Sequence, residues 1–202
     1  ISISIDLNMS NFVIVDFEWT SWAGNFSSFY GKDLRLEKRK DWQKREIIQI
    51  GAIKFNSKYK IISKLNLFVK PTINPKLSNY IKKLTGISQR KIDTKGKDFK
   101  NSFKKLKKFC TKCKVLANGE DEKILIANFK YNKMKNIKFK INNIKPILKN
   151  KYKIPNKFSQ SGIIHVYFGY KKIKNKMHDA VYDCGCIIKA MKKLKFNLNY
   201  IK

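Results

Sequence analysis

The sequence predicts an α/β fold in which a mixed sheet is flanked by helices. Two observations support this prediction. Before residue 70, apolar and β-branched residues form short runs typical of strands, and after it apolar positions recur at the spacing of helices. A chain of 202 residues is long enough for one well-filled core and too short for two comfortable domains, so we expect one sheet covered by helices.

The first predicted strand, residues 11–20 (NFVIVDFEWT), is the segment around which the rest is organised. Its β-branched and aromatic residues predict a strand covered on both faces. Side chains repeat every two residues along a strand, so Asp16 and Glu18 project from the same face. Two carboxylates in an apolar setting repel each other and lose hydration, which favours a divalent cation between them. If the strand instead ends by Asp16, both acids face water and imply no metal.

Two further strands are predicted at residues 46–55 and 61–69, joined by a turn at 56–58. Three consecutive strands indicate an antiparallel meander. The connection at residues 21–45 is long enough for a lid or binding loop, and its aromatic residues either stack on bases or pack beneath the loop.

Helical spacing begins near residue 77. A helix over residues 77–84 stops at Gly86, and a second helix at 98–110 carries apolar residues on one face and lysines on the other. An irregular region is expected around Pro146 and Pro155. The other predicted elements are a strand at 115–117, a helix at 120–132, a strand at 137–141, a short helix at 162–168 and a last helix at 179–194.

The net charge of +32 favours a nucleic-acid partner, because dense lysine attracts phosphate. Only four of the 46 basic residues are arginine, and heavy use of isoleucine, asparagine and lysine indicates drift in an A+T-rich genome. The charge therefore supports phosphate contacts more than base recognition. Only 14 acidic residues occur, and several cluster at 16–18, at 120–122 and at 179–183, so these positions are informative.

The four cysteines form two close pairs, Cys110 with Cys113 and Cys184 with Cys186. Two such pairs would suit a four-thiolate zinc site. However, the second pair lies in a helical pattern, where residues i and i+2 point to different sides. Reduced, partly buried thiols in a cytoplasmic protein are the favoured interpretation.

The sequence shows neither an apolar run of membrane-spanning length nor the pattern of a secretory signal, so we expect a cytoplasmic protein without a membrane partner. Residues 1–10 precede the organised sequence, and we expect a disordered or non-native extension there. The oligomeric state is not indicated.

The last predicted helix begins with MHDAVYDC, in which His178 and Asp183 are five residues apart. Five residues correspond to roughly 140° on an ideal helix, so these side chains do not share a face of that helix. A histidine just before the helix is nevertheless able to fold toward an aspartate in its first turns. The alternative is that Asp179 caps the helix and His178 is incidental.

Taken together, these segments resemble the DEDDh branch of the DnaQ-like 3′→5′ exonucleases. The resemblance covers residues 11–195 and rests on the D-x-E strand, EIIQIGAIKF, FVKPTINPKLSNYIKKLTGIS, the acidic helix start after NG, and H-x-x-x-x-D on the final helix. Within this branch the chain is similar to enzymes that trim small RNA, ribosomal RNA and histone messenger ends, and to their bacterial relatives. The resemblance implies a ribonuclease H-like fold with a five-stranded mixed sheet, and a single exonuclease domain over residues 11–202.

The resemblance also assigns roles to individual residues. It makes Asp16, Glu18 and Asp183 metal ligands and His178 the general base. The fourth ligand falls on Asp121 or Glu122, and we choose Asp121 because the family uses an aspartate there and the apolar Ile124 and Leu125 then align. Family members usually carry a tryptophan where this chain has Asn118. By position only, Phe17 and Trp19 are candidates for contact with the terminal nucleotide.

The implied activity is hydrolysis of single-stranded RNA or DNA from the 3′ end, with RNA favoured, by two Mg²⁺ or Mn²⁺ ions and a histidine base. His165 lies in an apolar run and is interpreted as structural. The alternative is a non-catalytic regulator on the same fold, because some bacterial relatives are described as inhibitors of a sporulation kinase pathway. The complete set of acids and the histidine favours the enzyme.

Overall fold

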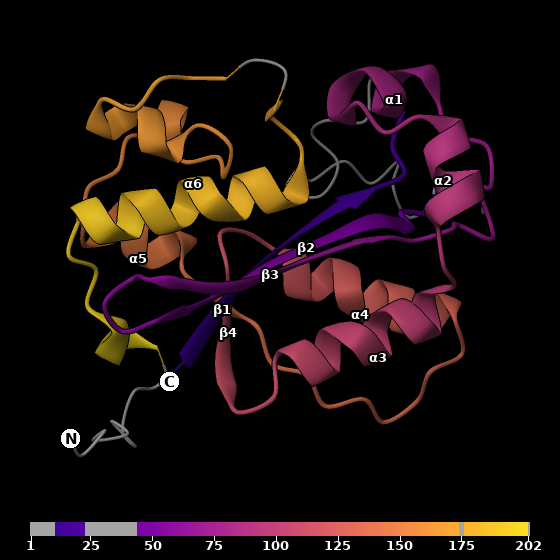
Figure 1. The fold of residues 1–202 in the computed structure, drawn as a ribbon, viewed down its shortest axis with the longest axis horizontal. Coiled ribbons are helices and arrows are strands. Elements are labelled where there is room, and N and C mark those ends of the chain that lie inside the picture. The colour runs from indigo at the N-terminus through magenta and orange to yellow at the C-terminus, as the bar shows by residue number, and fades with distance from the viewer. Residues whose placement is uncertain (1–10, 23–43, 174–175, 202) are drawn as a thin grey trace, which may run out of the picture.

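The computed structural model describes residues 11–22, 44–173 and 176–201 and shows one five-stranded sheet (Figure 1). Its order is β3-β2-β1-β4-β5. β1 pairs antiparallel with β2 and β2 with β3, whereas β4 runs parallel to β1 and β5 parallel to β4. The strands are β1 (Asn11–Trp19), β2 (Ile47–Asn56), β3 (Ile61–Phe68), β4 (Cys113–Ala117) and β5 (Asn142–Asn143). The predicted mixed sheet with an antiparallel beginning is confirmed.

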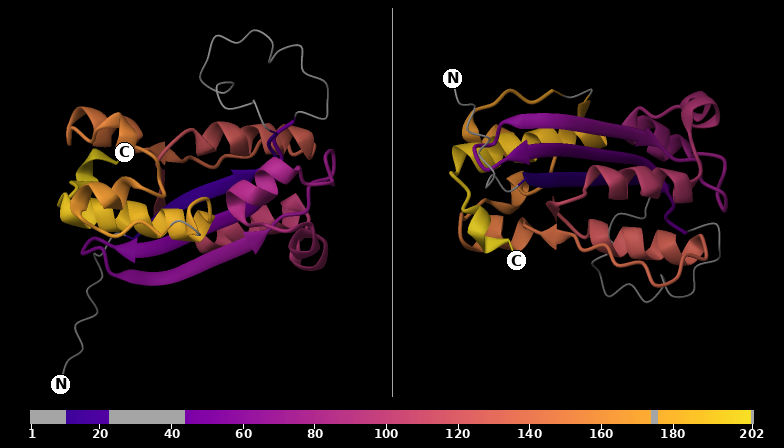
Figure 2. Two further views of the ribbon diagram at one scale, coloured as in Figure 1. Left: turned by 90° about the horizontal axis from the view of Figure 1, so that it is seen from above. Right: turned by 60° about the horizontal axis from the view of Figure 1, so that its bottom comes forward.

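Helices cover both faces of this sheet (Figure 2). α5 and α6 pack on one face, and α3 and α4 pack on the other. The helices are α1 (Asn79–Thr85), α2 (Gln89–Lys95), α3 (Phe99–Phe109), α4 (Asp121–Tyr131), α5 (Lys145–Asn150) and α6 (Ala180–Lys193), with short 3₁₀ helices at Asn156–Phe158, Ile164–Phe168 and Leu198–Tyr200. Within the described ranges, no helix is both long and apolar enough to cross a membrane.

The central strand β1 is buried along nearly its whole length, as expected for a strand covered on both faces. Phe12 and Ile14 belong to the core beneath α6, whereas Val13, Val15 and Phe17 belong to the core beneath α3 and α4. The two-residue period of the strand therefore directs the side chains of residues 16 and 18 toward the α6 face.

Gly51 allows the start of α6 to approach the sheet closely. It lies opposite Asp16 in the β1–β2 pairing, and a Cβ atom at this position would be 2.4 Å from the carbonyl carbon of Ala180. Only glycine permits such an approach of backbone to backbone. The first turn of α6 is thereby held beside the carboxyl end of β1.

The fifth strand was predicted at residues 137–141, and this prediction is wrong. The strand is limited to Asn142–Asn143, which pair with Leu116 and Ala117. The alternating apolar residues Ile137, Phe139 and Ile141 pack against the core below α3 and α4 without forming a ladder. Their period reflects one-sided packing of an extended segment, which periodicity does not distinguish from a strand.

Two short helices were not predicted, and one predicted helix is a 3₁₀ helix. α2 begins after Ser88, whose hydroxyl accepts a hydrogen bond from the Lys91 N–H, and α5 has Pro146 in its first turn. Each has one buried apolar residue, so the helical period is too short to stand out. The helix expected at 162–168 is the 3₁₀ helix Ile164–Phe168.

Candidate active site

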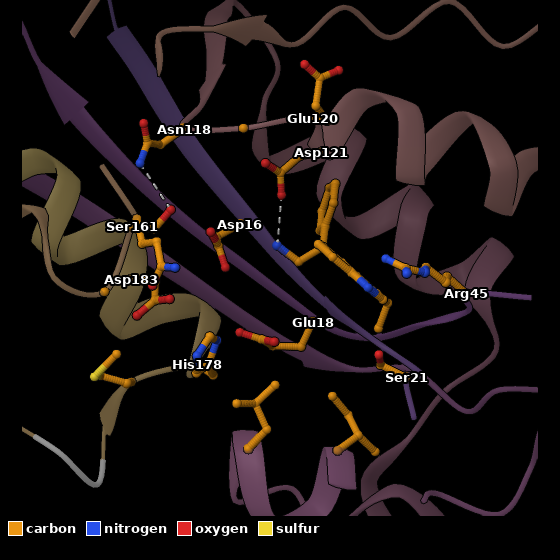
Figure 3. Close-up of a pocket in the computed structure, with 18 of the residues that line it drawn as sticks. Asp16, Glu18, Ser21, Arg45, Asn118, Glu120, Asp121, Ser161, His178 and Asp183 are labelled. Carbon is orange, nitrogen blue, oxygen red and sulfur yellow. Dashed lines mark hydrogen bonds between the residues drawn. The ribbon is translucent and has the colours of Figure 1, made fainter. Parts of the chain in front are cut away.

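Four buried carboxylates and a histidine line one pocket, of about 280 Å³, at the carboxyl end of β1 (Figure 3). These residues are Asp16, Glu18, Asp121, Asp183 and His178. The four acidic residues are only 5–8% exposed. The structure thus brings together all the residues that the resemblance implied, although they come from three distant parts of the chain.

Asp16 and Glu18 occupy the end of β1, where its pairing with β2 becomes irregular between Glu18 and Trp19. Burial raises the pKa of both carboxyl groups well above their ordinary values, and repulsion from Asp121 and Asp183 raises each pKa further. A hydrogen bond from Ser161 opposes the rise in the pKa of Asp16. Such a pair is costly to keep ionised without a cation.

Asp121 is the first residue of α4 and is tied to β1 by a hydrogen bond. The backbone N–H of Phe17 donates to its Oδ1 at 3.2 Å. Burial raises the pKa of Asp121 to about 7, and this hydrogen bond opposes the rise. The contact explains how an acid on the α4 side of the sheet reaches the same pocket as the acids of β1.

Glu122 does not line the pocket. Its carboxylate accepts a hydrogen bond from the Ile141 N–H at 2.9 Å and so holds the segment that leads to β5. Glu122 is therefore partly buried and bound to backbone, and it is not a solvated acid at the start of the helix. Glu120 lies at the pocket and forms an ion pair with Lys123 at 2.7 Å.

His178 and Asp183 are brought together by the turn that precedes α6. Asp179 caps the helix, accepting hydrogen bonds from two backbone N–H groups, and His178 before it has a left-handed backbone with φ of 61°. This conformation places His178 beside Asp183, although the two do not share a helix face (Figure 3). One ligand atom from each of Glu18, His178 and Asp183 lies within 4.8 Å of the others. Asp179 therefore caps the helix, and His178 nevertheless faces the pocket.

Burial shifts the pKa values of His178 and Asp183 in opposite directions. Burial lowers the pKa of His178, so its ring is neutral near pH 7 and able to accept a proton. Burial, followed by repulsion from Asp179, raises the pKa of Asp183 to about 7.

One wall of the pocket is formed by residues 160–162, which no sequence motif marks. Asn118 donates from Nδ2 to the Ser159 carbonyl at 3.0 Å and lies 3.4 Å from the Ser161 hydroxyl (Figure 3). A Cβ atom at Gly162 would lie 2.6 Å from Oδ1 of Asp183. Sequence reasoning missed Ser161 and Gly162 because their importance comes from a close approach to side chains of other segments, which no spacing records.

The donor set fits a hard divalent cation. Four carboxylates converge, and Oδ1 of Asp183 is buried without a hydrogen-bond partner among the described residues. Buried acceptors without a donor are rare, and a cluster of oxygen ligands is the arrangement that Mg²⁺ and Mn²⁺ prefer. The carboxylates of Asp16, Glu18, Asp121 and Asp183 line the pocket and are able to hold metal, and among the described residues Glu18, Asp183 and His178 have the ligand atoms that lie close together.

The two aromatic candidates for substrate contact also lie at the pocket. Phe17 is 2% exposed and belongs to the core beneath α3 and α4, and Trp19 packs partly against the same core. The facing wall comes from α1, through Tyr80, Ile81 and Leu84, which sequence reasoning did not select. The aromatic residues 26–42 of the long connection lie outside the described residues.

The cysteines do not assemble a zinc site. All four are free, with Cys110 and Cys113 in the core beneath α3 and α4, and Cys184 and Cys186 in the core beneath α6. His165 is 1% exposed, and its Nε2 lies 3.2 Å from the Lys171 carbonyl, as expected for a structural histidine.

A five-stranded mixed sheet with acids on its central strand and on two flanking helices defines a domain of the ribonuclease H-like class. The family model described as Exonuclease matches residues 13–191, and the chain belongs to this family. No curated protein matches the sequence.

Solved exonuclease structures have a similar fold. The nuclease domain of 3′hExo, a DEDDh family member bound to rAMP, has a TM-score of 0.77 at 23% identity, over 98% of this chain and 97% of that one. Cell-death related nuclease 4 (CRN-4) gives 0.70 at 21% identity, over 92% and 64%. Exonuclease I of E. coli in complex with a dT13 oligonucleotide gives 0.64 at 16% identity, over 95% and 42%. The predicted fold and the predicted exonuclease family are confirmed.

Proposed function

We propose that residues 11–202 form a single exonuclease domain that shortens single-stranded nucleic acid from the 3′ end and releases nucleoside 5′-monophosphates. RNA is the favoured substrate. The observation that carries the proposal is the convergence of Asp16, Glu18, Asp121, Asp183 and His178 in one buried pocket of a chain that belongs to the Exonuclease family.

The four carboxylates hold two divalent ions, Mg²⁺ or Mn²⁺, in this proposal. When bound, such ions offset the charge of the carboxylates and stabilise the attacking and leaving oxygens of an in-line displacement at phosphorus. The chain's own contribution is to hold its oxygens in place through the Phe17 N–H, Ser161 and Gly162.

His178 acts as the general base. Its ring is neutral at physiological pH because burial lowers its pKa, and it lies beside Glu18 and Asp183 in the pocket. A neutral imidazole is able to take a proton from the attacking water.

The substrate preference rests on the pocket and on similar structures. The pocket of about 280 Å³ suits one terminal nucleotide, and its lining includes Trp19 together with Tyr80, Ile81 and Leu84 of α1. The 3′hExo domain was determined with rAMP, and a further similar structure is described as recognising a histone mRNA stem-loop. These two structures have TM-scores of 0.77 and 0.74, above the 0.64 of exonuclease I with dT13, and this difference supports RNA over DNA. The alternative of a non-catalytic regulator is not favoured, because no acid of the proposed set is missing from the pocket.

The test is hydrolysis of 5′-labelled single-stranded RNA and DNA of matched sequence with Mg²⁺ or Mn²⁺, with and without chelator. We expect metal-dependent shortening from the 3′ end, faster on RNA, with nucleoside 5′-monophosphate as product. The matched control is Asp16→Asn, which removes one ligand charge and retains the basic surface, so it should bind RNA without hydrolysing it. Undiminished turnover by Asp16→Asn would contradict the proposal.

A further inference from the structure

A second hollow, of about 520 Å³, lies on the outer side of α6, between this helix, β3 and the segment after the 3₁₀ helix Ile164–Phe168. It shares no lining residue with the pocket of the four buried carboxylates and His178, which we call the metal pocket, and no step of the proposed reaction uses it. We call it the α6 groove and define it by Lys64, Tyr170, Tyr182, Gly185, Lys189 and Lys192.

Gly185 is responsible for part of this hollow. On α6, Val181, Gly185, Ile188 and Lys192 follow one helical stripe along the groove. A Cβ atom at Gly185 would meet a single atom within 4 Å, Cδ1 of Ile53 at 3.8 Å, so packing does not require glycine here. Glycine inside a helix costs about 1 kcal/mol relative to alanine. What the missing side chain provides at this position is open space.

The groove is positively charged, and this charge is available to a ligand. Lys64, Lys189 and Lys192 are exposed, and among the described residues no carboxylate forms an ion pair with any of them. The acid that lines the groove, Asp179, accepts hydrogen bonds from the N–H groups of Val181 and Tyr182 at the helix start.

Aromatic rings accompany these ammonium groups. Lys189 Nζ lies 5.5 Å from the ring centroid of Tyr170, and Tyr182 lines the same hollow. Single-stranded nucleic acid is bound by ammonium groups, which contact its phosphates, together with aromatic rings, on which its bases stack. An acidic protein segment would use the charges alone, whereas a nucleic acid would also use the parts of these rings that are not covered by their contacts with His165.

Residues that line the groove and residues that line the metal pocket are neighbours in the sequence of α6 and of the turn before it. His178 and Asp183 line the metal pocket, and Asp179, between them in the chain, lines the groove. Lys192 lies nine residues beyond Asp183, which corresponds to roughly 14 Å along the helix and to the opposite side of it, so a bound strand has to pass around α6. A strand whose 3′ end occupies the metal pocket must therefore be several nucleotides long to reach Lys192.

We propose that the α6 groove binds single-stranded nucleic acid upstream of the 3′ nucleotide, contacting its phosphates through Lys64, Lys189 and Lys192. The proposal rests on the proposed exonuclease function for the direction of the strand. It makes the groove an additional substrate site that favours long over very short substrates.

Three variants test the proposal. The triple variant Lys64→Glu, Lys189→Glu, Lys192→Glu reverses the charge of the groove. Gly185→Leu fills it without changing charge. The matched control Lys100→Glu, Lys104→Glu, Lys105→Glu makes the same change in charge on exposed residues of α3, on the opposite face of the sheet.

Binding is measured in chelator, so that it does not depend on hydrolysis, with a labelled single-stranded RNA of about 12 nucleotides. We expect both groove variants to raise Kd at least tenfold, and the α3 control by less than about threefold. The slope of log K against log salt should fall by about 2 in the groove triple variant, since each lost phosphate contact removes about 0.7. Equal weakening by the two triple variants would overturn the proposal, as would equal competition by polyglutamate, which would assign the groove to acidic protein segments.

Hydrolysis assays distinguish a failure of the groove proposal from a failure of the proposed function. In the parent protein with Mn²⁺, kcat/KM should be larger for the long RNA than for a dinucleotide, and the groove triple variant should lose that preference through KM. If the parent hydrolyses neither substrate but the groove variants still bind more weakly than the α3 control, the proposed function fails and the groove stands. If the parent hydrolyses both and its preference survives in the groove variants, the groove proposal fails alone.

Discussion

Single hydrogen bonds and close contacts decide which acidic side chains of this chain face the metal pocket. Asp121 and Glu122 are neighbours, yet one is bound to the backbone of β1 and the other to the backbone before β5. Residue type and family pattern favoured the first of them, and the structure shows why the second cannot turn inward without losing its own hydrogen bond.

The adjacent acids should therefore respond differently to substitution. We expect Asp121→Ala to be folded and inactive, because a carboxylate of the pocket is lost. Glu122→Ala should retain most activity but unfold with a free energy about 1–3 kcal/mol lower, because the Ile141 N–H loses a charged acceptor. Mn²⁺-dependent hydrolysis and denaturant unfolding of both variants provide the measurement. An active Asp121→Ala together with an inactive Glu122→Ala would move the ligand by one residue.

His178 is predicted to act on a proton. His178→Gln should lower kcat by about 10²- to 10⁴-fold and remove the acidic limb of the pH–rate profile, which lies below the ordinary pKa of histidine because burial lowers the pKa of this ring. Mn²⁺ affinity, measured by calorimetry, should change little. A large loss of Mn²⁺ affinity would instead make His178 a metal ligand, consistent with its nearness to Glu18 and Asp183.

Gly162 sets the position of the Asp183 carboxylate. In Gly162→Ala the new methyl group would overlap with Oδ1 of Asp183, so that side chain must move. We expect weaker Mn²⁺ binding and a fall in kcat, with a melting temperature close to that of the parent, because the displaced group is a side chain at a pocket. If this variant binds Mn²⁺ as tightly as the parent protein does, Gly162 has no influence on the Asp183 carboxylate as a metal ligand.

At the scale of elements, periodicity predicted the long strands and helices well. Strands at 46–55 and 61–69 and helices at 98–110 and 179–194 differ from the observed ones by one or two residues at most. The short elements were not predicted correctly, because a helix with one buried residue has no period to detect. The same holds for β5, which has only two paired residues. The placement of the site could be predicted only in part, because residues 160–162 approach Asp16 and Asp183 through tertiary packing alone.

The docking of α6 on β2 is expected to depend on Gly51. A methyl group in Gly51→Ala would overlap with the backbone of Ala180, so α6 must shift away from the sheet. We expect a loss of about 1–3 kcal/mol or more in unfolding free energy together with a strong loss of activity, because Asp183 moves with the helix.

The matched control for Gly51 is another glycine of the same contact region. Gly185→Ala meets no close neighbour and should raise the unfolding free energy by about 0.5–1 kcal/mol through better helix propensity. Denaturant unfolding measures the free energy of unfolding of both variants. Equal changes in Gly51→Ala and Gly185→Ala would contradict the claim that only Gly51 is in close contact with backbone.

At the scale of the whole molecule, the buried acids couple stability to pH. Burial raises the pKa of Asp121 and Asp183 to about 7 and also raises the pKa of Asp16 and Glu18. In the unfolded chain these groups ionise near pH 4. Between pH ~4 and ~7 the metal-free folded state therefore binds more protons than the unfolded state, so its stability falls as pH rises.

The corresponding prediction is a pH-dependent response to metal. In chelator, the melting temperature should be lower at about pH 8 than at about pH 5, and Mg²⁺ should raise it more at the higher pH, where the ligands are ionised. Asp121→Asn should reduce both effects. A melting temperature in chelator that rises through this range, with no response to Mg²⁺, would contradict the coupling.

The separation of the proposed ligands along the chain has a consequence during synthesis. Asp16 and Glu18 leave the ribosome early, whereas Asp183 follows when most of the fold has already emerged, and it reaches the site only after α6 docks against Gly51. Under the proposed roles, a partly translated chain holds an incomplete set of ligands and is unable to cut RNA. Under these roles, a newly made chain becomes active only after α6 has docked on the sheet.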